Sequence, residues 1–217
     1  MYKIKKRTKV QRQRSKRIAQ FNPGLTFSDA TTYVFSNAKR TAGVAAGSLL
    51  LVSMVAPNIA QALPRGGTVV GGSATISVPN AATMNINQSS NKAIINWNGF
   101  DINTNELVKF VQPGTSAVIL NRVVGADPSS ILGQMQANGR VFIVNPNGIF
   151  FGQSAVVDVA GLIATTLNIK DTDFMAGNYT FTQDQNAALA AIVNKGKIYI
   201  NDKGFAVFVA PLVSNEG

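Results

Sequence analysis

The ionisable residues of this 217-residue chain are poorly placed for catalysis or metal binding. The chain has no histidine and no cysteine, which argues against a zinc site, a histidine base and a cysteine nucleophile. Polysaccharide lyases and glycosidases need clustered carboxylates or a basic residue on one face. The acidic residues after residue 62 are scattered: Asp101, Glu106, Asp127, Asp158, Asp171, Asp173, Asp184, Asp202 and Glu216. Asp171 and Asp173 could pair, but beside Lys170 they are typical of a solvated loop. The sequence therefore predicts no catalytic residue, no metal site and no cofactor.

The most distinctive polar stretch lies in NGRVFIVNPNGIFFG, residues 138–152. A turn separates two runs of strand-forming residues there. Pro146 fixes its own φ, and Asn147 and Gly148 tolerate left-handed conformations, so the chain can bend sharply before Ile149. The amide of Asn145 can satisfy nearby backbone groups. The stretch predicts a tight turn between two strands.

The elements around this turn are short. From Leu63 onward, apolar runs of four to eight residues alternate with clusters of Asn, Gly, Asp and Pro, which predicts an all-β protein. Two short helices are also predicted. One spans residues 126–139, with Asp127 as N-cap and Pro128 at the first helical position. The other spans residues 182–196, where Thr182 and Gln185 form a capping box.

Asparagine indicates which β architecture is present. Of 21 asparagines, 18 lie after residue 62. Asn-x-Gly occurs at residues 194–196 and again at 215–217, which is 21 residues further on. This spacing suits one coil of a parallel β-helix, in which asparagines of successive coils can form a hydrogen-bonded ladder. A sandwich or barrel with coincidental spacing remains the alternative at this point.

The first 62 residues are predicted to be an extended secretory signal. They carry 11 of the 20 basic residues and one of the 10 acidic residues, which leaves nine of each in residues 63–217. Because residues 63–217 carry equal numbers of basic and acidic residues, they are not predicted to bind nucleic acid. An apolar run from about Ala42 to Val55 follows two cations, and Ala60 and Ala62 supply the small residues of a cleavage site. A buried core helix is the alternative for this run. Cleavage after Ala62 would make Leu63 the first residue of the mature chain.

A longer stretch carries a family resemblance. Residues 117–169, which contain Asn-Pro-Asn-Gly-Ile (145–149), resemble the secretion domain of two-partner-secretion exoproteins of the filamentous haemagglutinin type, and most of all the high-molecular-weight adhesins. The likeness covers essentially all of residues 63–217, although the additional Asn-Pro-Asn-Leu motif of some members is absent. The resemblance implies a right-handed parallel β-helix with an N-terminal cap and small extra-helical β elements. It also implies that 63–217 is the N-terminal part of a longer exoprotein.

The resemblance implies a function as well. Such a domain is exported into the periplasm by the Sec machinery. There the POTRA domains of a dedicated outer-membrane β-barrel transporter recognise it. It then nucleates β-helix folding outside a Gram-negative cell. The exoprotein is therefore expected to be secreted or to lie on the cell surface, and to contact the membrane only during export. The family implies that the turn formed by Asn145, Pro146, Asn147, Gly148 and Ile149 is required for secretion. Its asparagines either contact the transporter or serve a structural role.

Two further alternatives remain open. Asn121 and Arg122 are either a corner asparagine with a solvated arginine or part of the recognised surface. The segment itself could also be an adhesin or carbohydrate-binding module, although receptor binding in this family usually resides in the region further along the exoprotein. Exposed aromatic residues would support binding by this segment, whereas aromatic residues in alternating strands are more often core. The candidates are Trp97, Phe100, Phe110, Phe150 and Phe151.

Overall fold

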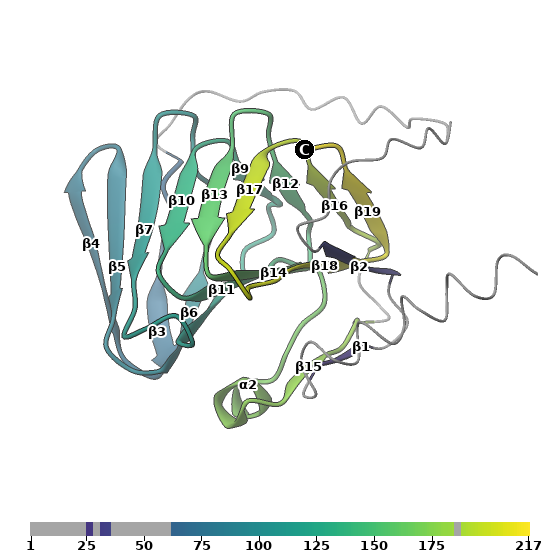
Figure 1. Ribbon diagram of the computed structural model, residues 1–217, viewed down its shortest axis with the longest axis horizontal. Coiled ribbons are helices and arrows are strands. Elements are labelled where there is room, and N and C mark those ends of the chain that lie inside the picture. Colours follow the sequence, from purple (N-terminus) through teal and green to yellow (C-terminus); the bar gives the residue numbers. More distant parts are fainter. Residues whose placement is uncertain (1–24, 28–30, 36–61, 185–187) are drawn as a thin grey trace, which may run out of the picture.

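The chain is folded almost entirely from β-strands, which confirms the predicted all-β class. The computed structural model describes residues 25–27, 31–35, 62–184 and 188–217. The strands wind into a solenoid of about five turns, the predicted parallel β-helix (Figure 1). Within the described residues there is one helix, α2 (Asp171–Ala176).

Three sheets form the walls of the solenoid. The first sheet contains β4 (Ala74–Asn80), β5 (Thr83–Gln88), β7 (Leu107–Val111), β10 (Gln134–Ala137), β13 (Val156–Val159) and β17 (Lys197–Ile200). The second contains β2 (Thr31–Phe35), β3 (Thr68–Gly71), β6 (Lys92–Trp97), β8 (Val118–Val123), β11 (Arg140–Val144), β14 (Gly161–Thr165) and β18 (Ala206–Ala210). The third contains β9 (Ser129–Ile131), β12 (Ile149–Phe151), β16 (Ala191–Asn194) and β19 (Leu212–Asn215). Strands of successive turns pair in parallel, so a full turn such as β10–β11–β12 adds one strand to each wall.

Antiparallel strands cap the start of the solenoid, as the resemblance implied. β3 pairs with β6, and β4 pairs with β5.

Two strands come from the predicted signal segment: β1 (Leu25–Phe27) pairs with β15 (Tyr179–Phe181), and β2 pairs with β18. Cleavage after Ala62 would separate β1 and β2 from these partners.

An excursion, residues 166–184, leaves the walls after β14 and holds α2 and β15 (Figure 1). It covers the outer face of the second sheet. The ring of Phe142, which points outward from β11, meets Phe174 of α2 at 5.9 Å and Tyr179 at 5.0 Å between centroids. This second apolar cluster explains why β11 and β14 are buried on both faces, whereas β7 and β13 alternate buried and exposed residues.

The main core fills the inside of the solenoid. Its side chains alternate with outward-facing ones along each strand, as in Ile95 and Trp97 of β6 and Ile119 of β8. The aromatic candidates for a binding surface are mostly part of this core. Trp97, Phe100, Phe110 and Phe151 are buried, and Phe150 is half-buried.

Both helix predictions are wrong over the described residues. Residues 126–139 form β9 and β10, because each strand is hydrogen-bonded to strands of the neighbouring turns: β9 to β12, and β10 to β7 and β13. In 182–196, residues 191–194 are β16, and residues 185–187 lie outside the described part of the chain. The stretch around Asp171 and Asp173, predicted to be a loop, is instead the first turn of α2, where acidic side chains favour a helix N-terminus.

The asparagine repeat is confirmed as a ladder. Asn194 and Asn215 are register partners in β16 and β19, and Asn194 Nδ2 donates to Asn215 Oδ1 at 2.7 Å. The 21-residue spacing therefore equals one turn of the solenoid at this position.

Candidate functional site: the Asn145–Ile149 corner

The predicted turn lies where the chain passes from β11 in the second sheet to β12 in the third. The Gly148 N–H donates to the Asn145 carbonyl at 3.1 Å, which closes a four-residue turn. Gly148 has a φ of +115°, and a Cβ built there would lie 3.1 Å from the Ala191 carbonyl oxygen. The turn therefore requires glycine at this position. Ile149 is buried and begins β12.

Asn145 is fully buried, and its side chain is occupied by intramolecular hydrogen bonds. Its Nδ2 donates to the Asp127 carbonyl at 3.1 Å and to Ser129 Oγ at 2.9 Å, both on the preceding turn of the solenoid. Its Oδ1 accepts the Asn147 N–H at 2.9 Å. This amide ties two successive turns together, so Asn145 is a structural residue of the corner.

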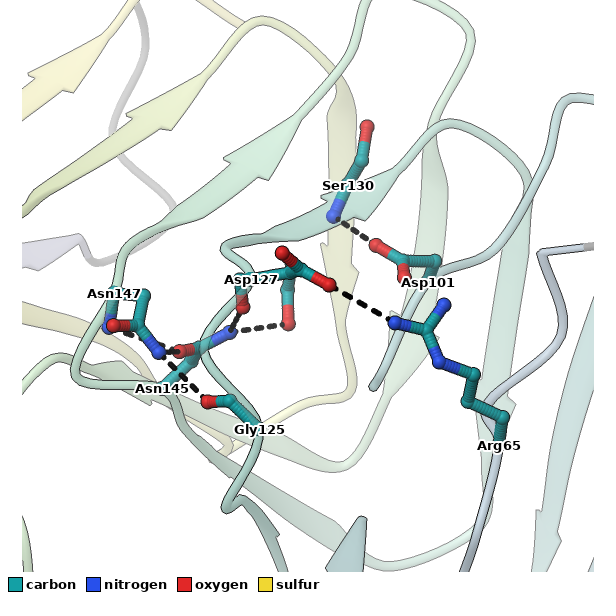
Figure 2. Close-up of polar contacts among 8 residues, drawn as sticks. Arg65, Asp101, Gly125, Asp127, Ser130, Asn145 and Asn147 are labelled. Atoms are coloured by element: carbon teal, nitrogen blue, oxygen red, sulfur yellow. Dashed lines mark hydrogen bonds and ion pairs between the residues drawn. The ribbon is translucent and has the colours of Figure 1, made fainter. Parts of the chain in front are cut away.

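Asn147 differs from Asn145 in exposure. It is exposed, and its Nδ2 donates to the Gly125 carbonyl at 2.9 Å (Figure 2). Pro146 beside it is half-buried. Of the five residues of the predicted motif, Asn147 alone is exposed, and its side chain is oriented by hydrogen bonds to the Gly125 carbonyl and to Asn145 Oδ1.

One ion pair and one hydrogen bond lie beside this corner. Arg65 Nη2 pairs with Asp127 Oδ2 at 3.0 Å, and the Ser130 N–H donates to Asp101 Oδ1 at 2.8 Å (Figure 2). Burial raises the pKa of the Asp101 carboxyl above its ordinary value of 3.8, although the Ser130 hydrogen bond and the Arg65 charge oppose this. Both groups of the Arg65–Asp127 pair are largely exposed, so the pair orients side chains more than it stabilises the fold.

The second predicted pair lies apart from this corner. Asn121 is fully buried, accepts a hydrogen bond from Trp97 Nε1 at 3.1 Å and faces the inside of the solenoid. Arg122 points outward beneath the excursion, where it pairs with Asp171 Oδ1 at 2.6 Å and donates to the Ile169 carbonyl. Only 12% of the Arg122 side chain is exposed. Arg122 is thus largely shielded from solvent, and it fastens the excursion to the wall.

The sequence did not single out Arg65, Asp101 or the corner role of Asp127. Asp127-Pro128 fits a helix N-cap locally, and no local signal shows that Arg65 meets a residue 62 positions further on. The predicted cleavage residues are partly described: Ala62 and Leu63 are half-buried, and Ala60 lies outside the described residues. Among the described residues, no cluster of three or more possible metal ligands occurs, and no helix is both long and apolar enough to cross a bilayer.

Comparison with known proteins decides the family. A family model described as the TPS (two-partner secretion) secretion domain matches residues 60–217. The chain belongs to the TPS secretion domain family. It is also similar to the crystal structure of the HMW1 secretion domain from Haemophilus influenzae, with 41% identity and a TM-score of 0.59 over 61% of this chain and 35% of that one.

Two curated relatives, both from H. influenzae, are described as heme/hemopexin-binding proteins. One is 42% identical over 120 residues, covering 55% of this chain and 13% of the relative. The other, from strain KW20/Rd, is 39% identical over 167 residues, covering 73% of this chain and 18% of the relative. The chain therefore spans less than a fifth of either relative. TPS exoproteins are exported from Gram-negative bacteria, and membership of the family implies an outer-membrane TPS transporter as partner.

Proposed function

We propose that residues 63–217 target a longer exoprotein for secretion by binding the POTRA domains of its outer-membrane transporter in the periplasm, after Sec-dependent export. The domain then nucleates folding of the exoprotein outside the cell, because each new turn adds strands to the existing walls. Two relatives named for heme and hemopexin binding make such binding a candidate property of the full-length protein. The residues that bind heme or hemopexin would then lie outside this domain, as would those that bind a host receptor.

The part of the domain that we assign to transporter binding is the corner surface. It is defined by the exposed residues Arg65, Val124, Ala126, Asp127, Pro128 and Asn147. Val124 is 57% exposed and immediately precedes Gly125, whose carbonyl accepts the Asn147 amide.

The observation that carries this assignment is the contrast between Asn147 and its neighbours. Asn145, Gly148 and Ile149 are buried and hold the turn, whereas Asn147 is held outward by Gly125. A preorganised polar group on a rigid corner binds without a large loss of conformational entropy. An adhesin or carbohydrate-binding role for this segment has less support, because four of its five candidate aromatic residues are buried.

The test is secretion of the chain in cells that also express its cognate transporter. Val124→Asp places a charge on the corner surface at a side chain that is 57% exposed, so the core is not disturbed. We expect secretion to fall at least tenfold while the thermal unfolding of the purified protein is unchanged. The matched control is Val78→Asp, since Val78 is 54% exposed on β4. Wild-type secretion of Val124→Asp, or equal loss in both variants, would show that the corner surface does not bind the transporter.

A further inference from the structure

Glu106 is a buried carboxylate with no cationic partner among the described residues. It immediately precedes β7 and is 7% exposed. Its Oε2 accepts the Asn103 N–H at 2.7 Å, and its Oε1 accepts the Ala62 N–H at 3.1 Å. None of the three ion pairs in the described part of the chain includes it. Burying a carboxylate is costly unless a charge or several hydrogen bonds compensate.

The donor at Oε1 is the last residue of the predicted signal. Cleavage after Ala62 would remove this N–H and create an α-ammonium group on Leu63, one residue further along. Consecutive Cα atoms are about 3.8 Å apart, so the new positive charge would arise one residue from the atom that now donates to Oε1.

The residues that follow the cleavage site are already fixed in the fold. Leu63 packs against the main core, and Pro64 is buried. Arg65 donates its N–H to the Gly99 carbonyl at 2.9 Å and accepts the Asn98 N–H at 2.9 Å. The new terminus would therefore be held close to Glu106 rather than move freely in solvent.

We propose that Glu106 is a binding site for the α-ammonium group that signal cleavage creates. Cleavage exchanges a neutral backbone donor for an ammonium group, which adds the attraction between opposite charges to the hydrogen bond with the carboxylate. Removal of the signal thereby completes the N-terminal end of the solenoid. This inference rests on the predicted cleavage after Ala62 and is independent of which surface the transporter binds.

The test is titration of the terminal amine in the processed protein. The 1–217 chain is exported with its own signal, purified from the periplasm and sequenced from its N-terminus, which should be Leu63. The α-amine is then ¹³C-methylated and titrated by NMR. We expect its midpoint to lie above the ordinary range of about 7.7–8.0, with an acid dissociation constant lowered at least threefold.

Glu106→Gln should return the midpoint to the ordinary range. The matched control, Glu216→Gln, removes an exposed carboxylate near the other end of the chain and should leave the raised midpoint unchanged. An ordinary midpoint in the wild-type protein would overturn the proposal even if Glu106→Gln failed to fold. A mature terminus other than Leu63 would also overturn it, whereas loss of secretion in a corner variant would not.

Discussion

Replacing either of the corner asparagines by alanine separates a structural role from a contact role. Asn145→Ala removes two hydrogen bonds to the preceding turn and the acceptor for the Asn147 N–H. Ser129, one of the groups left without this partner, is 1% exposed, so water cannot readily replace the amide. Asn147→Ala removes the bonds from its Nδ2 to the Gly125 carbonyl and to Asn145 Oδ1, and water can solvate the vacated position because Asn147 is exposed.

The size of each effect follows from these hydrogen bonds. At about 1 kcal/mol for each bond, Asn145→Ala should lower the free energy of unfolding by about 3 kcal/mol. In a domain of this size, each kcal/mol lowers Tm by about 2–4 °C, so a decrease of about 6–12 °C is expected. For Asn147→Ala, the loss should not exceed about 1 kcal/mol, because water can replace both lost bonds at this exposed position, and this corresponds to about 2–4 °C.

The assay is thermal unfolding of the processed protein, followed by tryptophan fluorescence. Trp97 is the only tryptophan of the chain and is fully buried in the main core, so its emission reports on the whole solenoid. Secretion should fall in both variants: through instability for Asn145→Ala, and through weaker transporter binding for Asn147→Ala. Equal, small decreases in Tm for the two variants would refute the structural assignment of Asn145. Normal secretion of Asn147→Ala would refute its assignment to the contact.

Three other predictions concern single positions. Arg122→Ala should lower stability by about 1–2 kcal/mol, because it breaks the ion pair with Asp171, whose side chain is 48% exposed, and the hydrogen bond to the Ile169 carbonyl. Limited proteolysis should then cut the excursion first; Arg122→Lys, which keeps the charge, should be cut more slowly. Gly148→Val should destabilise the fold by about 1–3 kcal/mol, because φ is +115° there, whereas Gly114→Ala, which has open space around its Cβ, should unfold like the wild type. Asp101 binds its proton more tightly in the folded than in the unfolded state, so its contribution to stability should decline as pH rises from its ordinary pKa of 3.8 through the raised value. Asp101→Asn should abolish this decline in urea unfolding measured from pH 3.5 to 7, and an unchanged pH profile would contradict the assignment.

The sequence alone determined the strand-rich character of the chain and the place of the tight turn. These features depend on local chemistry. Val, Ile and Phe alternate with turn residues, and a turn with positive φ needs glycine, which Gly148 supplies. The Asn-x-Gly repeat also predicted the solenoid, because Asn194 and Asn215 occupy the same place on successive turns.

Tertiary structure decided what the local pattern could not. Residues 126–139 carry helix signals, yet they form β9 and β10, because hydrogen bonds from the turns on either side outweigh a weak helix propensity. Arg122 fastens the excursion because the fold brings Asp171 against β8 from 49 residues away. Glu106 faces Ala62 for the same reason: the two residues are 44 positions apart and meet only when the solenoid is wound. Local sequence determines where turns and strand-forming runs lie, whereas the final conformation of segments such as 126–139 and the contacts between distant residues depend on the packing of complete turns.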